Sequence, residues 1–515
     1  MKAAELDLSL TPLPGAMPAW RASANAQQWR DTAQRVRERG GRLVALWASD
    51  ETTRAGGYMV HAGLAVRDGL LWMTLPIAHG TPEFPDISAL FPAADRMQRA
   101  AFDLVGVRAA DAPDQRRWLR HGAWPKGTYP LRKSFDAARV PEPQPDAYAF
   151  VPVTGEGVHE IPVGPVHAGT IEPGHFRFSV VGERVLRLEE RLGYKHKGVE
   201  KRFEALNVHE AGRLAGRISG DSTVAYAWAY AMAAEGAAGL TPPPRALWLR
   251  ALFLERERIA NHLGDLGFLA NDAGLAFGLA QMARLKEDVL RLNATLFGHR
   301  YLMDAIAPGG VSCDLTPDAG PALHAQHEML RAEVTRLRSI FDEHPGLQDR
   351  FVGTGRVLPE LAAQLGLTGF AGRASGMACD LRALLPIVPY SETGVQIAGA
   401  RTGDVAARVL VRFEELLESL ELCRKFVKRM PEGNIASLFP TPAAGSAGIG
   451  WVEGWRGEVM IALETAAGGR LHRVHAHDPS WHNWPVLEHA VIGNIVPDFP
   501  LINKSFNLSY SGVDL

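Results

Sequence analysis

Cysteine is scarce in this chain, which has three cysteines among 515 residues. Cys313, Cys379 and Cys423 lie far apart in the sequence, so no Cys-x-x-Cys metal motif is present. Isolated cysteines also argue against a disulfide framework and suit a reducing compartment. The sequence therefore excludes a metal site built from paired thiolates of this chain.

Membrane-spanning and secretory segments are also lacking. The first residues, MKAAELDLSLTPLPG, do not combine a basic start with an apolar stretch, so we expect no secretory signal. The uncharged run between Asp221 and Glu235 is thirteen residues long, whereas a spanning helix needs about 20. We expect no transmembrane segment, and association with a membrane only through other subunits.

Strong charge of either sign is absent as well. The formal net charge is −2 and no basic tail is visible, so the sequence offers no electrostatic case for nucleic acid as a partner. Apolar residues make up 46% of the chain and charged residues 22%, which is typical of a globular protein. A chain of this length predicts two or three domains.

The sequence predicts an α+β fold with a small N-terminal domain at 1–136. Apolar runs on both sides of Arg67-Asp68-Gly69 indicate a β-hairpin, because Asp-Gly accepts the backbone angles of a tight turn. Proline-rich residues 137–160 are predicted to form an extended linker. The remaining segment, 161–515, begins with a short β element that turns at Gly182-Glu183.

Beyond this β element the pattern becomes mainly helical. Leucines and other apolar residues recur at helical spacing between Pro244 and Ala307, and Asn271-Asp272-Ala273-Gly274 divides them into two helices. Further helices are predicted at 321–342 and 402–430. The tail from Gly450 onwards is predicted to form packed loops and short strands.

Several segments resemble one family in the same order along the chain. They are GPVHAGTIEPGHFRFSVVGE, GRISGDST at 216–223, LERERIANHLGDLGFLANDAGLAFG, GRASGMACDLR, VEGWRGEV and the terminal SFNLSYSGVDL. Together they resemble the 49-kDa (D-type) subunit of respiratory complex I and the large subunit of group 4 membrane-bound nickel–iron hydrogenases. The resemblance covers about residues 160–515 and is closest to the hydrogenase-4 and formate hydrogenlyase type.

The N-terminal domain resembles the 30-kDa (C-type) subunit of complex I. The resemblance rests on FDLVG, DQRRWL and YPLRKSF, spread over residues 102–135. Gln98 and Ala100 depart from this pattern, because the family usually has two glutamates beside the arginine that is Arg99 here. A fusion of 30-kDa and 49-kDa domains is typical of the hydrogenase-4 type.

At two places the family's hydrogenases carry the Cys-x-x-Cys pairs that hold nickel and iron. This chain has Ser219 and Ser222 at the first and Ser509 and Gly512 at the second. Serine is a hard, weakly acidic alcohol and glycine has no side chain, so a nickel–iron centre and hydrogen activation are not expected.

The resemblance implies a role in electron transfer beside an iron–sulfur cluster. A 4Fe–4S cluster is expected in a small partner subunit of the complex I B-type or hydrogenase small-subunit type, and no cofactor is expected in this chain. Antiporter-like membrane subunits are the other expected partners. The chain would lie peripherally on the cytoplasmic side of the cell membrane.

The pocket vacated by the metal is the predicted site, and quinone is its expected ligand by analogy with complex I. The candidate residues are His167, Ser219, Asp221, Ser222, Arg373 and Ser509. His167 lies in the loop where complex I has a quinone-contacting histidine. The partner tyrosine has no clear counterpart in the Ile218–Asp221 segment. Asp221 is either a buried proton carrier with a raised pKa or the cap of the following helix.

Two other functions are considered. One alternative is a non-catalytic scaffold that bridges the cluster subunit and the membrane arm. The other is an active hydrogenase, which the missing thiolates disfavour. In the preferred interpretation, an oxidoreductase of the NADH:quinone oxidoreductase or hydrogenase-4 type couples electron transfer to ion translocation. The electron donor, whether NADH, formate or ferredoxin, would enter through other subunits.

Overall fold

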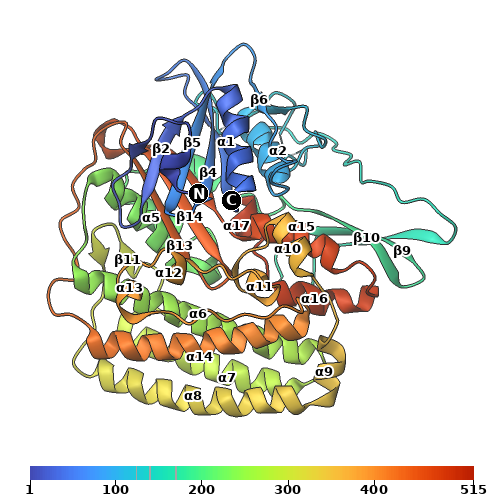
Figure 1. The fold of residues 1–515 in the computed structure, drawn as a ribbon, viewed down its shortest axis with the longest axis vertical. Helices are drawn as coiled ribbons and strands as arrows, with labels where there is room; N and C mark the ends of the chain where they lie inside the picture. The colour runs from blue at the N-terminus through green and yellow to red at the C-terminus, as the bar shows by residue number, and fades with distance from the viewer. Residues whose placement is uncertain (123, 139–140, 169–170) are drawn as a thin grey trace.

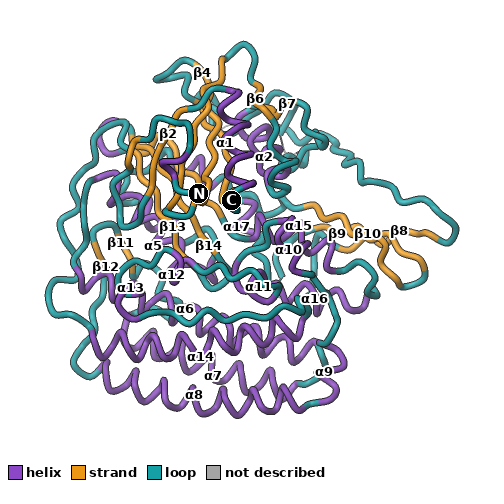
Figure 2. Tube along the Cα trace, in the orientation of Figure 1, coloured by secondary structure: helices purple, strands orange, loops and turns teal. Residues whose placement is uncertain are grey.

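The computed structural model describes residues 1–122, 124–138, 141–168 and 171–515. An N-terminal β-sheet with two helices lies above a layer of long helices, and a second sheet lies between them (Figure 1). A three-stranded β-sheet projects from one side of the molecule (Figure 2). The predicted α+β class is therefore confirmed.

The N-terminal domain is built on a five-stranded sheet with the order β1-β2-β5-β4-β3, in which β2 and β5 are parallel. The predicted hairpin is present, since Val66 pairs with Gly69 across a turn formed by Arg67 and Asp68. The elements of this domain are η1 (Ala3–Glu5), β1 (Thr11–Pro12), β2 (Ala19–Ser23), α1 (Ala26–Glu38), β3 (Arg42–Asp50), β4 (Gly57–Val66), β5 (Gly69–Ala78), β6 (Glu83–Pro85), α2 (Ala94–Val105) and β7 (Arg108–Ala110).

The described residues between β7 and Val158 form neither helix nor strand. The projecting sheet follows, with the order β10-β9-β8, and comprises β8 (Val158–Val163), β9 (His175–Val181) and β10 (Arg184–Arg191). Strands β9 and β10 turn at Gly182-Glu183, as predicted. The extended linker and the domain bounds at 136 and 160 stay predictions.

The long helices form the base of the molecule (Figure 1). They are α5 (Thr223–Ala238), α6 (Pro244–Asp272), α7 (Ala276–Phe297), α8 (Ala319–Glu343) and α14 (Val405–Arg429). The predicted break at 271–274 separates α6 from α7. Shorter elements connect them: α3 (Val199–Phe203), α4 (Ala211–Ala215), η2 (Gly220–Ser222), β11 (Ile306–Ala307), β12 (Gly310–Val311), α9 (Pro345–Phe351), α10 (Pro359–Leu365), α11 (Gly369–Ala374), α12 (Leu381–Leu384) and α13 (Tyr390–Thr393).

The tail forms a regular sheet, which is more order than the predicted loops and short strands. It contains β13 (Ala447–Glu453), β14 (Glu458–Thr465), η3 (Ala467–Gly469), β15 (Leu471–His477), α15 (Ser480–Ala490), η4 (Val496–Asp498), α16 (Phe499–Phe506) and α17 (Ser511–Asp514). Helix α5 packs closely on this sheet. Glycine is needed at 448 and 450, because an added Cβ would lie 1.8 and 1.9 Å from carbonyl oxygens of α5.

The two domains share a buried junction. The indole of Trp47 on β3 stacks between His61 of the same sheet and His475 on β15, with ring centroids 5.0 and 4.6 Å away. His475 Nδ1 lies 2.8 Å from Glu200 Oε1. This junction fixes the N-terminal sheet against β13–β15, whose β13–β14 turn carries residues of the site.

Candidate functional site

The two segments that resemble metal-binding motifs meet in space. Ser219, just before η2, and Ser509, near the C-terminus, have their hydroxyl oxygens 2.9 Å apart. The Ser219 hydroxyl donates to Asp221 Oδ1 at 2.8 Å, and the Gly512 backbone N–H donates to Ser509 Oγ at 2.9 Å. Three of the four positions that carry thiolates in hydrogenases are thus joined by hydrogen bonds.

A guanidinium completes this arrangement. Arg456, in the turn between β13 and β14, donates to Asp221 Oδ2 at 2.5 Å and to Ser222 Oγ at 3.3 Å. Its Nε donates to the Asn507 carbonyl at 2.6 Å. We call Ser219, Asp221, Ser222, Arg456 and Ser509 the serine cluster.

The serine cluster reaches the surface of the chain at Asp221. The Asp221 side chain is 39% exposed, whereas the three serines and Arg456 are buried. Burial favours the neutral form of Asp221. The charge of Arg456 and the hydrogen bonds from Arg456 and the Ser219 hydroxyl outweigh this effect of burial, so the pKa of Asp221 lies below its ordinary value. The expectation of a raised pKa is therefore wrong, and the reason is an arginine far away in sequence. Asp221 also does not cap α5 with its side chain.

Gly512 is confined by a second acidic residue. A Cβ built at Gly512 would lie 2.5 Å from Asp478 Oδ2 and 2.9 Å from Ser509 Oγ. The same Asp478 oxygen accepts a hydrogen bond of 2.8 Å from the Tyr226 hydroxyl. Tyr226 lies one turn into α5, so a buried phenol does reach the edge of the serine cluster through Asp478.

His167 does not join the serine cluster. Its Nε2 lies 2.8 Å from the Gly174 carbonyl oxygen, and its ring packs on Phe176 with centroids 5.7 Å apart. The backbone of Gly174 approaches the ring of Tyr510, since a Cβ at 174 would lie 2.5 Å from Tyr510 Cε1. The end of the His167 loop at Gly174 therefore packs on the ring of Tyr510, the residue after Ser509.

Arg373 belongs to a different group of charges. Its Nε donates to Glu415 Oε1 at 2.7 Å and its Nη1 to Glu453 Oε1 at 2.8 Å. His262 Nε2 lies 2.9 Å from the other Glu415 oxygen. We call this group the arginine network, and its members are Glu255, Arg258, His262, Arg373, Asp380, Arg382, Glu415 and Glu453.

Opposite charges keep most of the arginine network ionised. Burial opposes ionisation of Glu415, but Arg373 and His262 outweigh it and hold its pKa well below the ordinary value. Burial acts likewise on Glu255, yet Arg258 and Arg382 lower its pKa to about 2. Glu453 differs, because burial together with Asp380 and Glu458 raises its pKa to about 7.

Glu257 on α6 is a further buried carboxyl group beside the serine cluster. It accepts hydrogen bonds from the backbone N–H groups of Val224 at 2.6 Å and Ala225 at 3.2 Å, at the start of α5. Burial dominates over these hydrogen bonds and, with the charge of Asp221, raises its pKa to about 8. Burial therefore favours the neutral form of Glu257.

Three residues of this site were not among the sequence candidates. Arg456 lies inside the resembling segment VEGWRGEV, and Asp478 lies between that segment and the terminal SFNLSYSGVDL, but no spacing connected them with Asp221 or Gly512. Tyr226 lies several residues beyond the Ile218–Asp221 segment, where the resemblance places the partner tyrosine. Its helical phase relative to Ser222 was the signal that could have placed it on the same side of α5.

Three side chains of types that can bind metal ions lie together elsewhere, at the domain junction. Among the described residues, Glu51, Glu464 and His472 bring ligand atoms within 4.8 Å of one another. Arg54 forms ion pairs with both carboxylates, and Arg21 pairs with Glu464 at 2.6 Å. The negative charge of this cluster is already balanced by arginines.

Comparison with known proteins agrees with this architecture. Residues 22–140 match the family model of the respiratory-chain NADH dehydrogenase 30 Kd subunit, and residues 272–442 match that of the 49 Kd subunit. These matches define a fused 30-kDa/49-kDa subunit of the complex I type.

Individual relatives extend the match to nearly the whole chain. Formate hydrogenlyase subunit 5 of Escherichia coli K12 is 32% identical, over 93% of this chain and 85% of the relative. Hydrogenase-4 component G of the same organism is 30% identical, over 92% and 84%. The chain belongs to this family of fused 30-kDa/49-kDa oxidoreductase subunits.

A solved structure is similar as well. A chain of the membrane-bound sulfane sulfur reductase (MBS), an archaeal respiratory membrane complex, superposes with a TM-score of 0.66 and 26% identity. The match covers 70% of this chain and 99% of the other. Among the helices of the described residues, none has the length and apolarity to cross a bilayer.

Proposed function

We propose that this chain is the peripheral-arm subunit of a membrane-bound, complex-I-like oxidoreductase, and that it works without a nickel–iron centre. Its serine cluster would hold the electron acceptor beside a 4Fe–4S cluster of a small partner subunit. Electron transfer would be coupled to ion translocation by antiporter-like membrane subunits. The proposal is supported by the family of its relatives and by the donor atoms at the vacated positions.

The single observation that carries the proposal is the chemistry of the serine cluster. Its groups are hydroxyls, a carboxylate and a guanidinium, and low-valent nickel and iron prefer soft thiolates. Gly512 leaves no room for a side chain beside Asp478. The residues present do not fit a nickel–iron centre, whereas they do offer hydrogen-bond donors to a polar acceptor.

A quinone is the acceptor that we propose. Reduction of a quinone to a quinol consumes two electrons and two protons. The partner's cluster would supply the electrons. The phenol of Tyr226, hydrogen-bonded to Asp478, and the neutral carboxyl group of Glu257 would hold protons near the cluster. The ion pair of Asp221 and Arg456 would orient the quinone head at the exposed edge.

The test is a pair of measurements on the purified complex. Quinone reduction is assayed with the native electron donor, and nickel is measured in the same sample. We expect quinone reduction without stoichiometric nickel, and loss of activity without dissociation in the Asp221→Ala variant. Unchanged turnover in that variant would exclude this pocket, and stoichiometric nickel would restore the hydrogenase interpretation.

A scaffold function is the second candidate, and the closure of the serine cluster favours it. The hydroxyls of Ser219 and Ser509 bond to each other, and Arg456 satisfies Asp221. A complex that transfers electrons by another route and reduces no quinone would support this alternative.

A further inference from the structure

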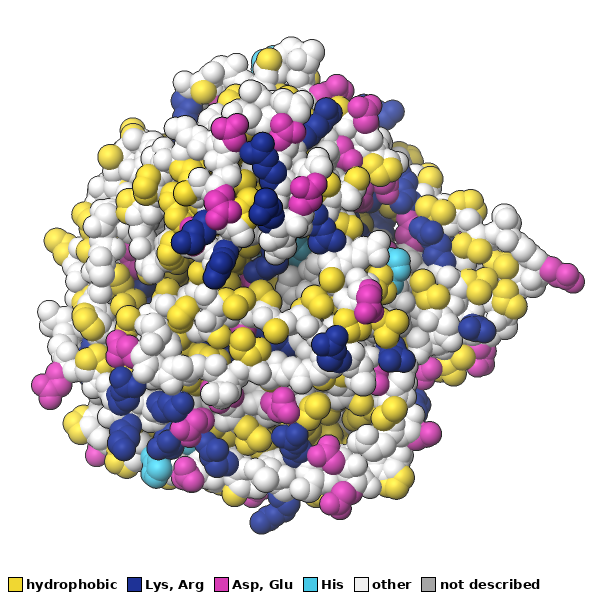
Figure 3. All heavy atoms as spheres, in the orientation of Figure 1, with side chains coloured by type: hydrophobic (Ala, Val, Ile, Leu, Met, Phe, Trp, Pro, Cys, Tyr) yellow, Lys and Arg dark blue, Asp and Glu magenta, His cyan; other side chains and the backbone are white. Residues whose placement is uncertain are grey.

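A groove lies between the two domains, away from the serine cluster. One cavity of about 350 Å³ and another of about 270 Å³ lie on either side of the Gly40–Arg42 segment and share Cys379. Lysine and arginine side chains, with acidic side chains among them, surround a hollow in the middle of the face shown in Figure 3. We call these two cavities together the interdomain groove.

The floor of the interdomain groove is apolar and comes from both domains. Val66 of the N-terminal sheet faces Leu384, Leu385 and Trp451 in the larger cavity. Leu384 is 52% exposed. The smaller cavity is lined by apolar side chains from both domains, namely Leu43, Phe91, Leu365, Leu367 and Met377. Leu43, Phe91, Leu365 and Leu367 are themselves buried, so Leu384 is the exposed apolar side chain among those named, and an occupant would cover it.

The rim of the interdomain groove is positively charged. Arg37, Arg39 and Arg67 are exposed, and none of them forms an ion pair within the described part of the chain. Arg42 is already neutralised by Glu458. Three uncompensated guanidinium groups over an apolar floor select an occupant that is both acidic and apolar.

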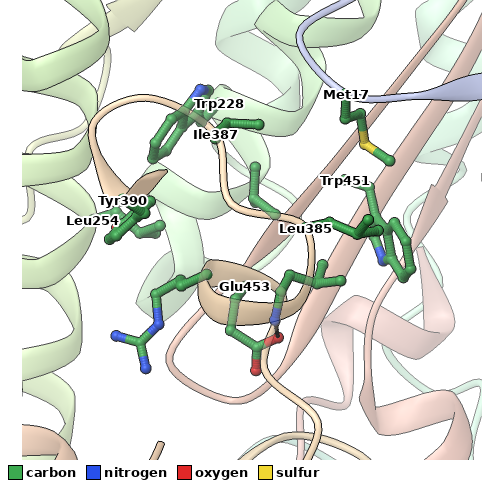
Figure 4. Close-up of a pocket in the computed structure, with 11 residues that line it drawn as sticks. Met17, Trp228, Leu254, Leu385, Ile387, Tyr390, Trp451 and Glu453 are labelled. Atoms are coloured by element: carbon green, nitrogen blue, oxygen red, sulfur yellow. Dashed lines mark hydrogen bonds between the residues drawn. The ribbon is translucent and has the colours of Figure 1, made fainter. Parts of the chain in front are cut away.

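The groove is shallow at its inner end. Leu385 and Trp451, which line the larger cavity, also line an inner cavity together with Trp228, Tyr390 and Glu453 (Figure 4). The inner cavity measures about 20 Å³, enough for a water-sized group but not for a side chain. An occupant must therefore lie along the groove and not pass into the interior.

We propose that the interdomain groove binds an extended acidic segment of a partner subunit. Apolar side chains of that segment would fill the two cavities on either side of Gly40–Arg42. Its carboxylates would pair with Arg37, Arg39 and Arg67. Two separate cavities divided by backbone suit alternating side chains of a peptide better than one continuous acyl chain. This inference is independent of the chemistry at the serine cluster.

Photo-cross-linking in the assembled complex tests the proposal. The cross-linking amino acid p-benzoylphenylalanine replaces Leu384, and in a control it replaces Arg30, which is exposed on α1 outside the groove. We expect the Leu384 position to cross-link one partner segment that carries acidic and apolar residues, and the Arg30 position not to. Cross-links to lipid, to a second copy of this chain, to a segment without acidic residues or to nothing would each overturn the proposal.

Charge reversal tests the rim separately. We expect the Arg39→Glu/Arg67→Glu variant to retain about tenfold less of the cross-linked partner. The retention that remains should no longer depend strongly on salt concentration. The matched control Arg30→Glu/Arg35→Glu makes the same charge change on the surface of α1 and should retain the partner. Equal retention in both variants, with unchanged thermal unfolding, would contradict a role for the rim.

Discussion

The serine cluster and the arginine network are both groups of buried charges, yet they differ in how they meet the surface. Every member of the arginine network is buried, and each carboxylate faces at least one guanidinium or imidazole. The serine cluster has one ion pair, and its carboxylate is 39% exposed. Charges sealed within the core serve folding, whereas a carboxylate left at an opening is available to a ligand or a partner subunit.

Removing one charge from the arginine network should give the largest effect on stability. Arg373→Leu would leave Glu415 and Glu453 without their shared cation in the core. Breaking a buried ion pair in this way costs about 3–5 kcal/mol of unfolding free energy. Denaturant unfolding of the purified chain measures this loss as a lower midpoint concentration.

Arg291→Leu is the control for this measurement. Arg291 pairs with Glu287 on the exposed face of α7, with 73% of its side chain accessible. A surface pair of this kind contributes less than about 1 kcal/mol. Equal losses in the two variants would show that burial does not distinguish these ion pairs.

Asp221→Asn should affect turnover much more than stability. The variant removes the negative charge that holds Arg456, at the exposed edge of the proposed site. We expect turnover of the complex to fall by about 100-fold, because the orientation of the quinone head depends on this charge. The unfolding free energy should change less than in Arg373→Leu, because the Asp221 side chain is 39% exposed and an asparagine can still accept a hydrogen bond from Arg456.

Asp304→Asn is a closely matched control. Asp304 also receives two hydrogen bonds from one arginine, Arg217, and its side chain is likewise 39% exposed. It lies outside the serine cluster, so turnover should be unchanged. If both variants lose activity equally, the serine cluster has no special role.

The sequence predicted the parts of this comparison that depend on local pattern. The hairpin at Arg67-Asp68 and the helix break at 271–274 follow from turn residues and helical spacing. The meeting of Ser219 with Ser509 followed from resemblance to a family in which both positions hold one metal. None of these three predictions required knowledge of the tertiary packing.

The partners of Asp221 could not be predicted in this way. Arg456 lies 235 positions further along the chain, in a turn whose location depends on the packing of β13 and β14 against α5. This contact lowers the pKa of Asp221, which is opposite to the direction expected from burial alone. Arg373 was predicted to line the pocket, and the structure brings it together with Glu415 and Glu453 instead.

Glu257 is a buried carboxyl group that forms no salt bridge among the described residues. Its pKa in the folded chain, about 8, lies above the ordinary value of 4.5. The folded state therefore binds an additional proton between these values, and stability should fall as pH rises from about 4.5 to 8, by at most about 1.4 kcal/mol per pH unit.

The Glu257→Gln variant should remove this contribution to the pH dependence. Stability is measured by denaturant unfolding at several pH values between 5 and 8. As pH increases from 5 to 8, the unfolding free energy of the variant should rise relative to that of the unmodified chain. A constant difference between the two proteins would mean that Glu257 is ionised in the folded chain.

Ser219→Ala should give the smallest effect and decides whether the serine cluster is closed or open to a ligand. The variant removes the hydrogen bonds to Ser509 and Asp221, while Ser509 keeps its bond from the Gly512 N–H. We expect a loss of about 1 kcal/mol in unfolding free energy. In a quinone site, the KM for quinone should also change while nickel content and assembly do not. An unaltered KM, with the same loss of stability, would assign the hydroxyl pair to structure and favour the scaffold.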